Sequence, residues 1–232
     1  MYPPPGMVGP RLIAAWALRT QSRDVQVDGL EHVPAHGPVL IVARHYHHLL
    51  DGAVLVQHVR RPLHIVVALD WTADARQRRW MERACRWSQW PVILRPATTP
   101  SAAAYDASEI ARYLRSGLRD AAHLLRDGRA VVVFPEGYPA VDPTASPATP
   151  RARDAGGFLP FAAGYRTIAQ LAQHGGSPPV AIVPLGFAYR RDGDRFDIVA
   201  RFGAPLGLGD GPEAVERAVR SLSAPSIPAA FR

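Results

Sequence analysis

Two apolar segments of this chain each lead directly into a cluster of polar residues, and this pattern constrains the fold more than any other feature. Residues 39–43 are apolar and are followed by three histidines and then by Asp51. Residues 130–134 are apolar and are followed by a proline, Glu136 and a glycine. Because the carboxyl ends of parallel strands meet at one edge of an α/β sheet, the two strand ends predict a single active site at that edge.

Strand-like and helix-like segments alternate along the rest of the chain. Short apolar or β-branched runs predict strands at residues 24–30, 38–43, 64–69, 91–94, 130–134, 179–185 and 196–202. Longer stretches with helical spacing of apolar residues predict helices at residues 11–20, 51–59, 73–90, 101–127, 164–174 and 212–222. The alternation predicts an α/β sandwich with a mostly parallel sheet flanked by helices.

The length favours one domain. A chain of 232 residues can form one α/β domain with a sizeable core, and no linker divides it into two periodic halves. We expect residues 23–232 to form that domain and residues 1–22 to form an N-terminal helical segment that could face a membrane. No run in this segment reaches the roughly 18 apolar residues that a span requires, so a soluble or peripheral protein is expected.

The chain is basic, and all of its basic residues except histidine are arginines. It has 27 arginines and no lysine against 20 acidic residues, for a formal charge of +7. This charge favours anionic partners such as phosphates or an acidic lipid surface, whereas no nucleic-acid-binding motif is present. Cys85 is the only cysteine, which excludes a disulfide framework and a cysteine zinc site and fits a reducing cytosol.

The histidine cluster offers a general base. A histidine can take a proton from a substrate hydroxyl when a carboxylate orients it through its other ring nitrogen. His45 follows the predicted strand directly, and Asp51 begins the next predicted helix. His47 and His48 are alternative bases, because any one of the three rings could instead cap or pack against the loop.

Five short segments occur in an order and spacing that a known family shares. They are residues 45–51, 87–95, 134–137, 161–169 and 182–186. The most specific is the Phe-Pro-Glu-Gly sequence at residues 134–137. Together they resemble the glycerolipid acyltransferases of the 1-acylglycerol-3-phosphate acyltransferase type, over residues 24–205.

The resemblance implies a function and a mechanism. The fold would be a glycerolipid-acyltransferase-like sandwich, with residues 23–232 as the acyltransferase domain. The enzyme would transfer a fatty acyl group from acyl-coenzyme A or acyl carrier protein to a hydroxyl of a (lyso)glycerolipid or related acceptor. His45 would be the base and Asp51 its orienting partner, with no metal and no cofactor besides the acyl thioester co-substrate.

The resemblance also implies substrate contacts. The residues expected to bind substrate are Arg95, Phe134, Pro135, Glu136 and Gly137. Arg95 would meet a phosphate as a bidentate donor. The expected partners are the acyl thioester, the lipid-like acceptor, an acyl carrier protein and an anionic membrane. From the basic surface and the tryptophan-containing helices we expect a cytoplasmic protein that is peripheral on the inner face of the cell membrane.

The first and second blocks depart from the family pattern. Family spacing counted back from Asp51 reaches Tyr46, which cannot act as a base near neutral pH, so we expect one extra loop residue and His45 as the base. In the second block, residues 88–90 replace the usual glycine, which would narrow an acyl channel.

The third block departs at its end. It continues with Tyr138 and Pro139 where the family has Thr-Arg, so the arginine expected to hold an acceptor phosphate is absent. Lysophosphatidic acid is therefore in question as the acceptor. Arg151 or Arg153, in the next loop, could substitute for it, but we expect both to be solvated surface side chains.

Two other functions deserve comparison. The His45-Tyr46-His47 sequence is a His-x-His pair after a strand, as in zinc hydrolases, although no Asp-His pair follows it. The altered third block is compatible with a catalytically inactive protein that binds lipid or a membrane surface. Trp80 and Trp87 are seven residues apart on one predicted helix face, where core packing is expected and a lipid-facing patch is the alternative.

Overall fold

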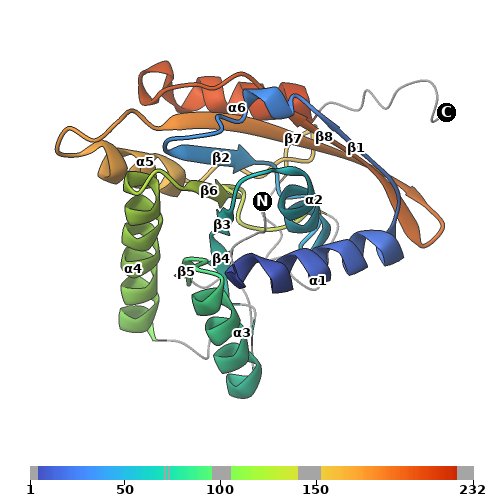
Figure 1. Ribbon diagram of the computed structural model, residues 1–232, viewed down its shortest axis with the longest axis horizontal. Helices are drawn as coiled ribbons and strands as arrows, with labels where there is room; N and C mark the ends of the chain where they lie inside the picture. The colour runs from blue at the N-terminus through green and yellow to red at the C-terminus, as the bar shows by residue number, and fades with distance from the viewer. Residues whose placement is uncertain (1–4, 71, 73, 96–105, 141–152, 224–232) are drawn as a thin grey trace.

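The structure, a computed structural model, describes residues 5–70, 72, 74–95, 106–140 and 153–223. Within these residues the strands are β1 (Ser22–Asp28), β2 (Val39–Ala43), β3 (Leu63–Ile65), β4 (Val67–Ala68), β5 (Val92–Ile93), β6 (Ala130–Val133), β7 (Ala181–Asp192) and β8 (Arg195–Phe202). Six of them form one sheet in the order β1-β8-β7-β2-β6-β3, and β4 and β5 form a second sheet (Figure 1). Neighbouring strands run parallel except β7 and β8. The predicted mostly parallel sheet is confirmed.

Helices cover both faces of the main sheet (Figure 1). The helices of the described residues are α1 (Pro5–Gln21), α2 (Leu50–His58), α3 (Ala75–Trp87), α4 (Ala107–Arg126), α5 (Gly164–Gln173) and α6 (Gly211–Leu222), with short 3-10 helices η1 (Leu30–His32) and η3 (Leu208–Asp210). Helices α1 and α2 pack on one face, and α4, α5 and α6 pack on the other.

The central strand β2 divides the hydrophobic core into two layers. All of its residues are buried. Because side chains alternate along a strand, Ile41 packs with α1 and α2 while Val42 packs with α4, α5 and α6. Strand β2 pairs with β6 on one side and β7 on the other, so its carboxyl end lies beside the carboxyl end of β6.

The strand predicted at residues 64–69 is two strands in different sheets. β3 pairs with β6, and β4 pairs with β5 in the smaller sheet. The backbone N–H of Val66 still donates to Val132 of β6, whereas that of Val67 donates to Pro91, next to β5. The single predicted strand is wrong because the chain changes its hydrogen-bonding partner between these two residues.

Strand β7 is longer than the predicted strand at residues 179–185. It continues to Asp192 and forms an antiparallel hairpin with β8. The extension carries Phe187 and Tyr189, both of which contribute to the core beside α1 and α2. The sequence pattern stopped short because a glycine, Gly186, interrupts the apolar run.

The prediction that the tryptophans of this helix pack in the core is wrong. The side chains of Trp80 and Trp87 on α3 are 65% and 57% exposed. Trp90 lies beyond the end of α3 and is half-buried, with its indole N–H donating to the Leu63 carbonyl at 3.0 Å. Trp71, which the sequence grouped with them, lies outside the described residues.

Candidate active site

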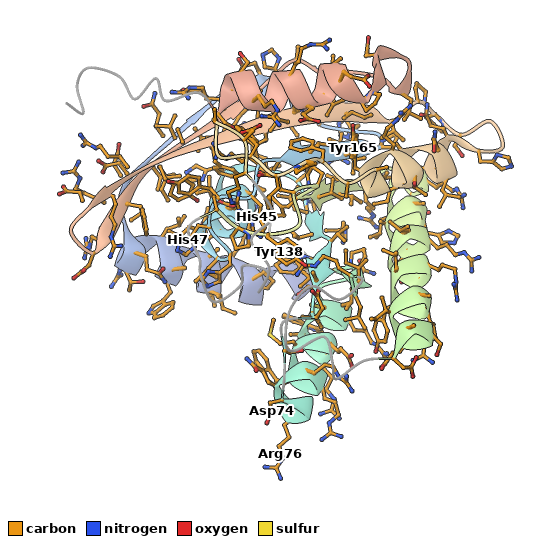
Figure 2. The ribbon with its side chains drawn as sticks, turned by 180° about the vertical axis from the view of Figure 1, so that it is seen from behind. His45, His47, Asp74, Arg76, Tyr138 and Tyr165 are labelled. Atoms are coloured by element: carbon orange, nitrogen blue, oxygen red, sulfur yellow. The ribbon has the colours of Figure 1, made fainter. Side chains whose placement is uncertain are left out.

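His45 and Asp51 meet at the carboxyl end of β2. His45 lies in the loop after β2, near the centre of the molecule (Figure 2), and Asp51 lies in the first turn of α2. Nδ1 of His45 is 3.0 Å from Oδ2 of Asp51. The imidazole stacks on the ring of Phe134, with centroids 4.5 Å apart. The side chain of His45 therefore meets the aspartate, whereas Tyr46 contacts it through the backbone N–H.

The Asp51 carboxylate is fully buried and accepts hydrogen bonds at both oxygens. Oδ2 accepts from the backbone N–H groups of Tyr46 at 2.6 Å and His47 at 3.0 Å, in addition to its contact with His45. Oδ1 accepts from the hydroxyl of Tyr189 at 2.6 Å. A buried carboxylate needs such donors to replace the lost water, and here they also fix its orientation.

The other two histidines of the cluster are placed differently. Nδ1 of His47 accepts from the backbone N–H groups of Leu49 and Leu50, both at 3.3 Å, so the ring caps the start of α2. His48 is exposed and its ring stacks on His47 with centroids 4.8 Å apart. Nδ1 of His47 is thus directed at the backbone of α2, whereas Nδ1 of His45 is directed at the Asp51 carboxylate.

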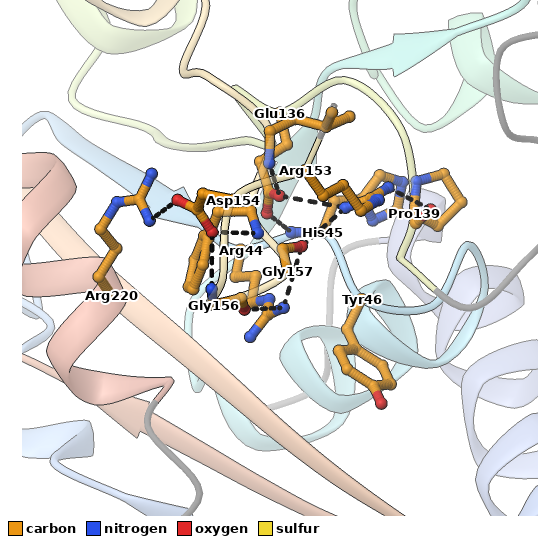
Figure 3. Close-up of polar contacts among 12 residues, drawn as sticks. Arg44, His45, Tyr46, Glu136, Pro139, Arg153, Asp154, Gly156, Gly157 and Arg220 are labelled. Carbon is orange, nitrogen blue, oxygen red and sulfur yellow. Dashed lines mark hydrogen bonds and ion pairs between the residues drawn. The ribbon is translucent and has the colours of Figure 1, made fainter. Parts of the chain in front are cut away.

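Glu136 ties the end of β6 to the histidine loop. Its Oε1 accepts from the backbone N–H of His45 at 3.1 Å, and its Oε2 accepts from that of Leu159 at 3.0 Å (Figure 3). Burial raises the pKa of Glu136, and the two backbone donors oppose that shift. The carbonyl of Pro135 accepts from the N–H of Ala162 at 2.9 Å. The Phe-Pro-Glu-Gly segment thus positions the backbone on which His45 sits.

The guanidinium of Arg95 is already engaged within the protein. Its Nε and Nη2 donate to the Asp70 carboxylate at 2.8–3.1 Å, and its plane lies over the Tyr138 ring at 3.8 Å. Nη1 is buried and has no hydrogen-bond partner among the described residues. Asp70 therefore takes the bidentate face of Arg95 that we had expected to meet a phosphate.

Gly137 makes room for this arginine. Its backbone φ is 76°, in the left-handed region that favours glycine, and a Cβ there would lie 3.3 Å from Nη1 of Arg95. The glycine of the third block therefore brings Arg95 beside the turn that carries Glu136.

Arg153 is not a solvated surface side chain, contrary to the expectation. Its Nη1 donates to the Gly157 carbonyl at 2.9 Å and lies 3.6 Å from Oε2 of Glu136 (Figure 3). Arg44, which directly precedes the histidine loop, also donates to the Gly157 carbonyl, at 3.4 Å. Two arginines thus gather near Glu136. Arg151 lies outside the described residues.

Sequence reasoning missed three residues of this site: Asp70, Tyr189 and Arg44. Tyr189 lies on the part of β7 that the sequence did not predict, and its position two residues after Phe187 is the alternation that a longer strand would show. Asp70 closely follows β4, so its position at a strand end was the available signal. Arg44 directly follows β2 and carried the same signal.

Metal ligands do not gather at this site. Among the described residues, no three histidine, cysteine, aspartate or glutamate side chains are grouped so as to hold a metal ion. The His45 and His47 rings, which form the His-x-His pair of the hydrolase hypothesis, contact different partners through Nδ1. That hypothesis therefore lacks a third ligand in the part of the chain that the structure describes.

Comparison with known proteins identifies the family. A family model described as Acyltransferase matches residues 24–188. Among solved structures, the 1-acyl-sn-glycerophosphate (LPA) acyltransferase PlsC from Thermotoga maritima is similar, with a TM-score of 0.58 and 17% sequence identity. The match covers 93% of this chain and 77% of that one. A search of curated protein sequences finds no match. The family match over most of the chain and the shared fold confirm the resemblance, and the chain belongs to the acyltransferase family of enzymes that transfer acyl groups.

Proposed function

We propose that the protein transfers a fatty acyl group from an acyl thioester to a hydroxyl of a (lyso)glycerolipid, with His45 as general base. The observation that carries the proposal is the pair formed by Nδ1 of His45 and the buried carboxylate of Asp51 at the end of β2. With Nδ1 directed at Asp51, Nε2 is the nitrogen available to an acceptor hydroxyl.

The reaction needs one base and accurate positioning. Nε2 of His45 takes the proton of the acceptor hydroxyl as its oxygen attacks the thioester carbonyl, and Asp51 stabilises the resulting imidazolium. Collapse of the tetrahedral intermediate breaks the carbon–sulfur bond, and the leaving thiolate takes the proton from His45. Because a thioester is already activated, positioning of the two substrates supplies much of the acceleration. The proposal includes no covalent acyl-enzyme and no cofactor besides acyl-coenzyme A or acyl carrier protein.

The acceptor would be held by the strand end of β6 and a nearby arginine. Arg153, whose side chain is partly exposed and lies 3.6 Å from Oε2 of Glu136, is the cation that would contact a phosphate on the acceptor. Glu136 and Gly137 would shape this side of the site, and Phe134 would support the base through its ring contact with His45. The similar structure from Thermotoga maritima is described as an LPA acyltransferase, which makes lysophosphatidic acid the first acceptor to test.

Thiol release tests this function. Acyl-coenzyme A and acyl carrier protein thioesters are offered with lysophosphatidic acid, other lysolipids and simple alcohols as acceptors. We expect acceptor-dependent release of thiol by the wild type and a loss of roughly 10²-fold to 10⁴-fold in His45→Ala, the contribution typical of a general base. Folded wild-type protein that releases no thiol with any pair would contradict the proposal and favour the inactive lipid binder. Activity that chelation removes and zinc restores would favour the hydrolase.

We further propose that the enzyme acts while bound to an anionic membrane, through a tryptophan face. This face comprises the exposed apolar side chains Leu12, Ile13, Trp16, Trp80 and Trp87. The two helices that contribute them adjoin, because the Trp87 ring lies within contact distance of Gly9 on α1. None of the helices in the described ranges combines the length and the apolar composition of a membrane span.

Arginines accompany the tryptophan face on α3. The exposed ones are Arg76, Arg79, Arg83 and Arg86. Exposed tryptophans beside arginines on one helix are typical of a segment that lies in the interface of an anionic bilayer. Helix α3 also projects away from the main sheet, with Asp74 and Arg76 at its far end (Figure 2).

A further inference from the structure

Tyr189 reaches the catalytic aspartate from a part of the sheet that the acyltransferase match does not include. It lies on β7, where it pairs with Ile198 of β8 in the antiparallel hairpin. The family match ends at residue 188. The tyrosine hydroxyl donates to Oδ1 of Asp51 at 2.6 Å across 138 residues of sequence.

The two oxygens of Asp51 have different partners. Oδ2 faces His45 and two backbone N–H groups of the histidine loop. Oδ1 has Tyr189 as its hydrogen-bond donor among the described residues. A carboxylate can rotate about its terminal bond, and that torsion is broad. The Tyr189 hydroxyl therefore opposes a rotation that would turn Oδ2 away from His45.

The tyrosine ring is itself held on several sides. It stacks on Tyr46 with centroids 4.4 Å apart and planes 4° from parallel. Phe196 meets it edge-on at 5.7 Å, and Phe187 lies at 6.1 Å. Burial, followed by the neighbouring Asp51 charge, raises the pKa of Tyr189 well above its ordinary value. The hydroxyl therefore stays protonated and acts as a donor at any physiological pH.

We propose that Tyr189 is a positioning residue, which fixes the Asp51 carboxylate so that Oδ2 orients His45 for proton transfer. The inference rests on the proposed acyl transfer with His45 as the base. Tyr189 does not touch substrate in this role, because its hydroxyl is directed at Asp51. It acts on the base through the aspartate, as donors behind a ligand or a catalytic group commonly do.

Removal of the Tyr189 hydroxyl should change the kinetics of the enzyme in a specific way. Tyr189→Phe keeps the ring and its stacking but leaves Oδ1 without its donor. We expect kcat to fall by about tenfold to a hundredfold, the usual cost of losing a partner that orients a functional group, with KM for both substrates little changed. The rising limb of kcat/KM against pH should move to higher pH, because a carboxylate with one donor fewer stabilises the protonated imidazole beside it more strongly.

The matched control is Tyr165→Phe. Tyr165 is also a buried tyrosine, on α5 (Figure 2), and its hydroxyl has no hydrogen-bond partner among the described residues. We expect this variant to keep the kcat, KM and pH profile of the wild type. A Tyr189→Phe enzyme with a kcat within twofold of wild type and an unmoved pH limb would overturn the inference.

A second variant covers the case in which Tyr189→Phe is poorly folded. Incorporation of 3,5-difluorotyrosine at position 189 keeps the ring and the hydroxyl and makes the hydroxyl a stronger donor. The pH limb should then move to lower pH, opposite to its displacement in Tyr189→Phe. An unmoved limb, or a shift in the same direction for both replacements, would contradict the positioning role.

An NMR titration separates this inference from the proposed function. The imidazole resonance that disappears in His45→Ala reports on the base without any substrate. Its titration midpoint should rise in Tyr189→Phe and stay unchanged in Tyr165→Phe. An unchanged midpoint in Tyr189→Phe would overturn the positioning role even in an active enzyme. A shifted midpoint in a protein that releases no thiol would refute the proposed acyl transfer while supporting the link from Tyr189 to His45.

Discussion

Nδ1 of His47 lies 3.3 Å from the backbone nitrogen of Leu50 and accepts its hydrogen bond at the start of α2. Backbone N–H groups in the first turn of a helix have no partner within the helix, so a side-chain acceptor there stabilises it. Leu49 occupies the N-cap position and its side chain makes no capping hydrogen bond, so His47, two residues before it, provides the acceptor. His47 also lies two residues after the histidine that faces Asp51. Neighbouring histidines thus have separate tasks.

Substitution of these histidines should separate stability from activity. We expect His47→Ala to lower the free energy of unfolding by about 1 kcal/mol, the typical cost of a lost helix cap, and to retain at least a tenth of the activity. His45→Ala should abolish most of the activity with little loss of stability. Denaturant unfolding and thiol release measure the two effects, and His47→Asn, which can still cap, should recover the stability. The opposite assignment would follow if His47→Ala were inactive and His45→Ala active.

Gly186, the last residue of the segment 182–186, has a packing role that makes a second prediction. A Cβ at Gly186 would lie 2.3 Å from the carbonyl carbon of Leu222 and 2.4 Å from the nitrogen of Ser223, at the end of α6. Gly186→Ala should therefore displace α6 and cost about 1–3 kcal/mol of stability, as overpacking usually does. Gly209→Ala is the control, because a Cβ there meets open space, and it should change stability by less than about 0.5 kcal/mol. Equal unfolding midpoints for the two variants would refute this explanation.

The secondary-structure elements predicted correctly from the sequence are those that a short local pattern of residues marks. The strand before His45 and the strand before Glu136 were readable because apolar runs end abruptly in polar residues. Their neighbourhood was also predictable, since carboxyl ends of parallel strands share an edge. The placement of His45 at Asp51 depended on the family resemblance and on its position close to the end of the strand, one residue after Arg44.

The contacts that could not be predicted are those between distant segments. Tyr189 meets Asp51 only because β7 continues into a hairpin, and a pairing register is not visible in a single strand. Arg95 was expected to hold a phosphate, but a partner for a guanidinium depends on tertiary packing, which places Asp70 against it. Trp80 has the spacing of a core residue, yet its helix packs against the body through other positions.

The buried His64 predicts a pH dependence of stability. Its Nδ1 lies 3.0 Å from the Gln89 carbonyl, to which it donates, and Nε2 is buried without a partner among the described residues. Burial lowers the pKa of His64 in the folded protein. The unfolded chain, with a pKa of about 6.5, therefore takes up the proton first as the pH falls. The contribution of the neutral ring to stability is complete above that pH and is lost as the pH falls below it.

Comparison with His64→Asn isolates this effect. Asparagine can still donate to the Gln89 carbonyl but does not titrate. Between pH 6.5 and 5 we expect the free energy of unfolding to fall more steeply in the wild type than in the variant, by at most about 1.4 kcal/mol per pH unit. Denaturant unfolding at several pH values measures both slopes. Parallel curves would show that His64 is not the group responsible.

The tryptophan face predicts binding to anionic vesicles. Trp80 and Trp87 are more than half exposed on a helix whose exposed arginines complement an acidic lipid surface. We expect sedimentation with vesicles that contain phosphatidylglycerol, and weaker binding to neutral phosphatidylcholine vesicles or at high salt, because salt screens exposed charges.

The double substitution Trp80→Ser and Trp87→Ser should reduce binding severalfold and leave activity on a short-chain, water-soluble acceptor unchanged. Trp90→Phe is the control, since that ring is half-buried and its N–H is bonded to Leu63. Vesicle binding that is equal in the double variant and the wild type would place the membrane contact elsewhere, whereas a loss limited to vesicle-borne acceptors would identify α3 as the element that brings the active site to its lipid.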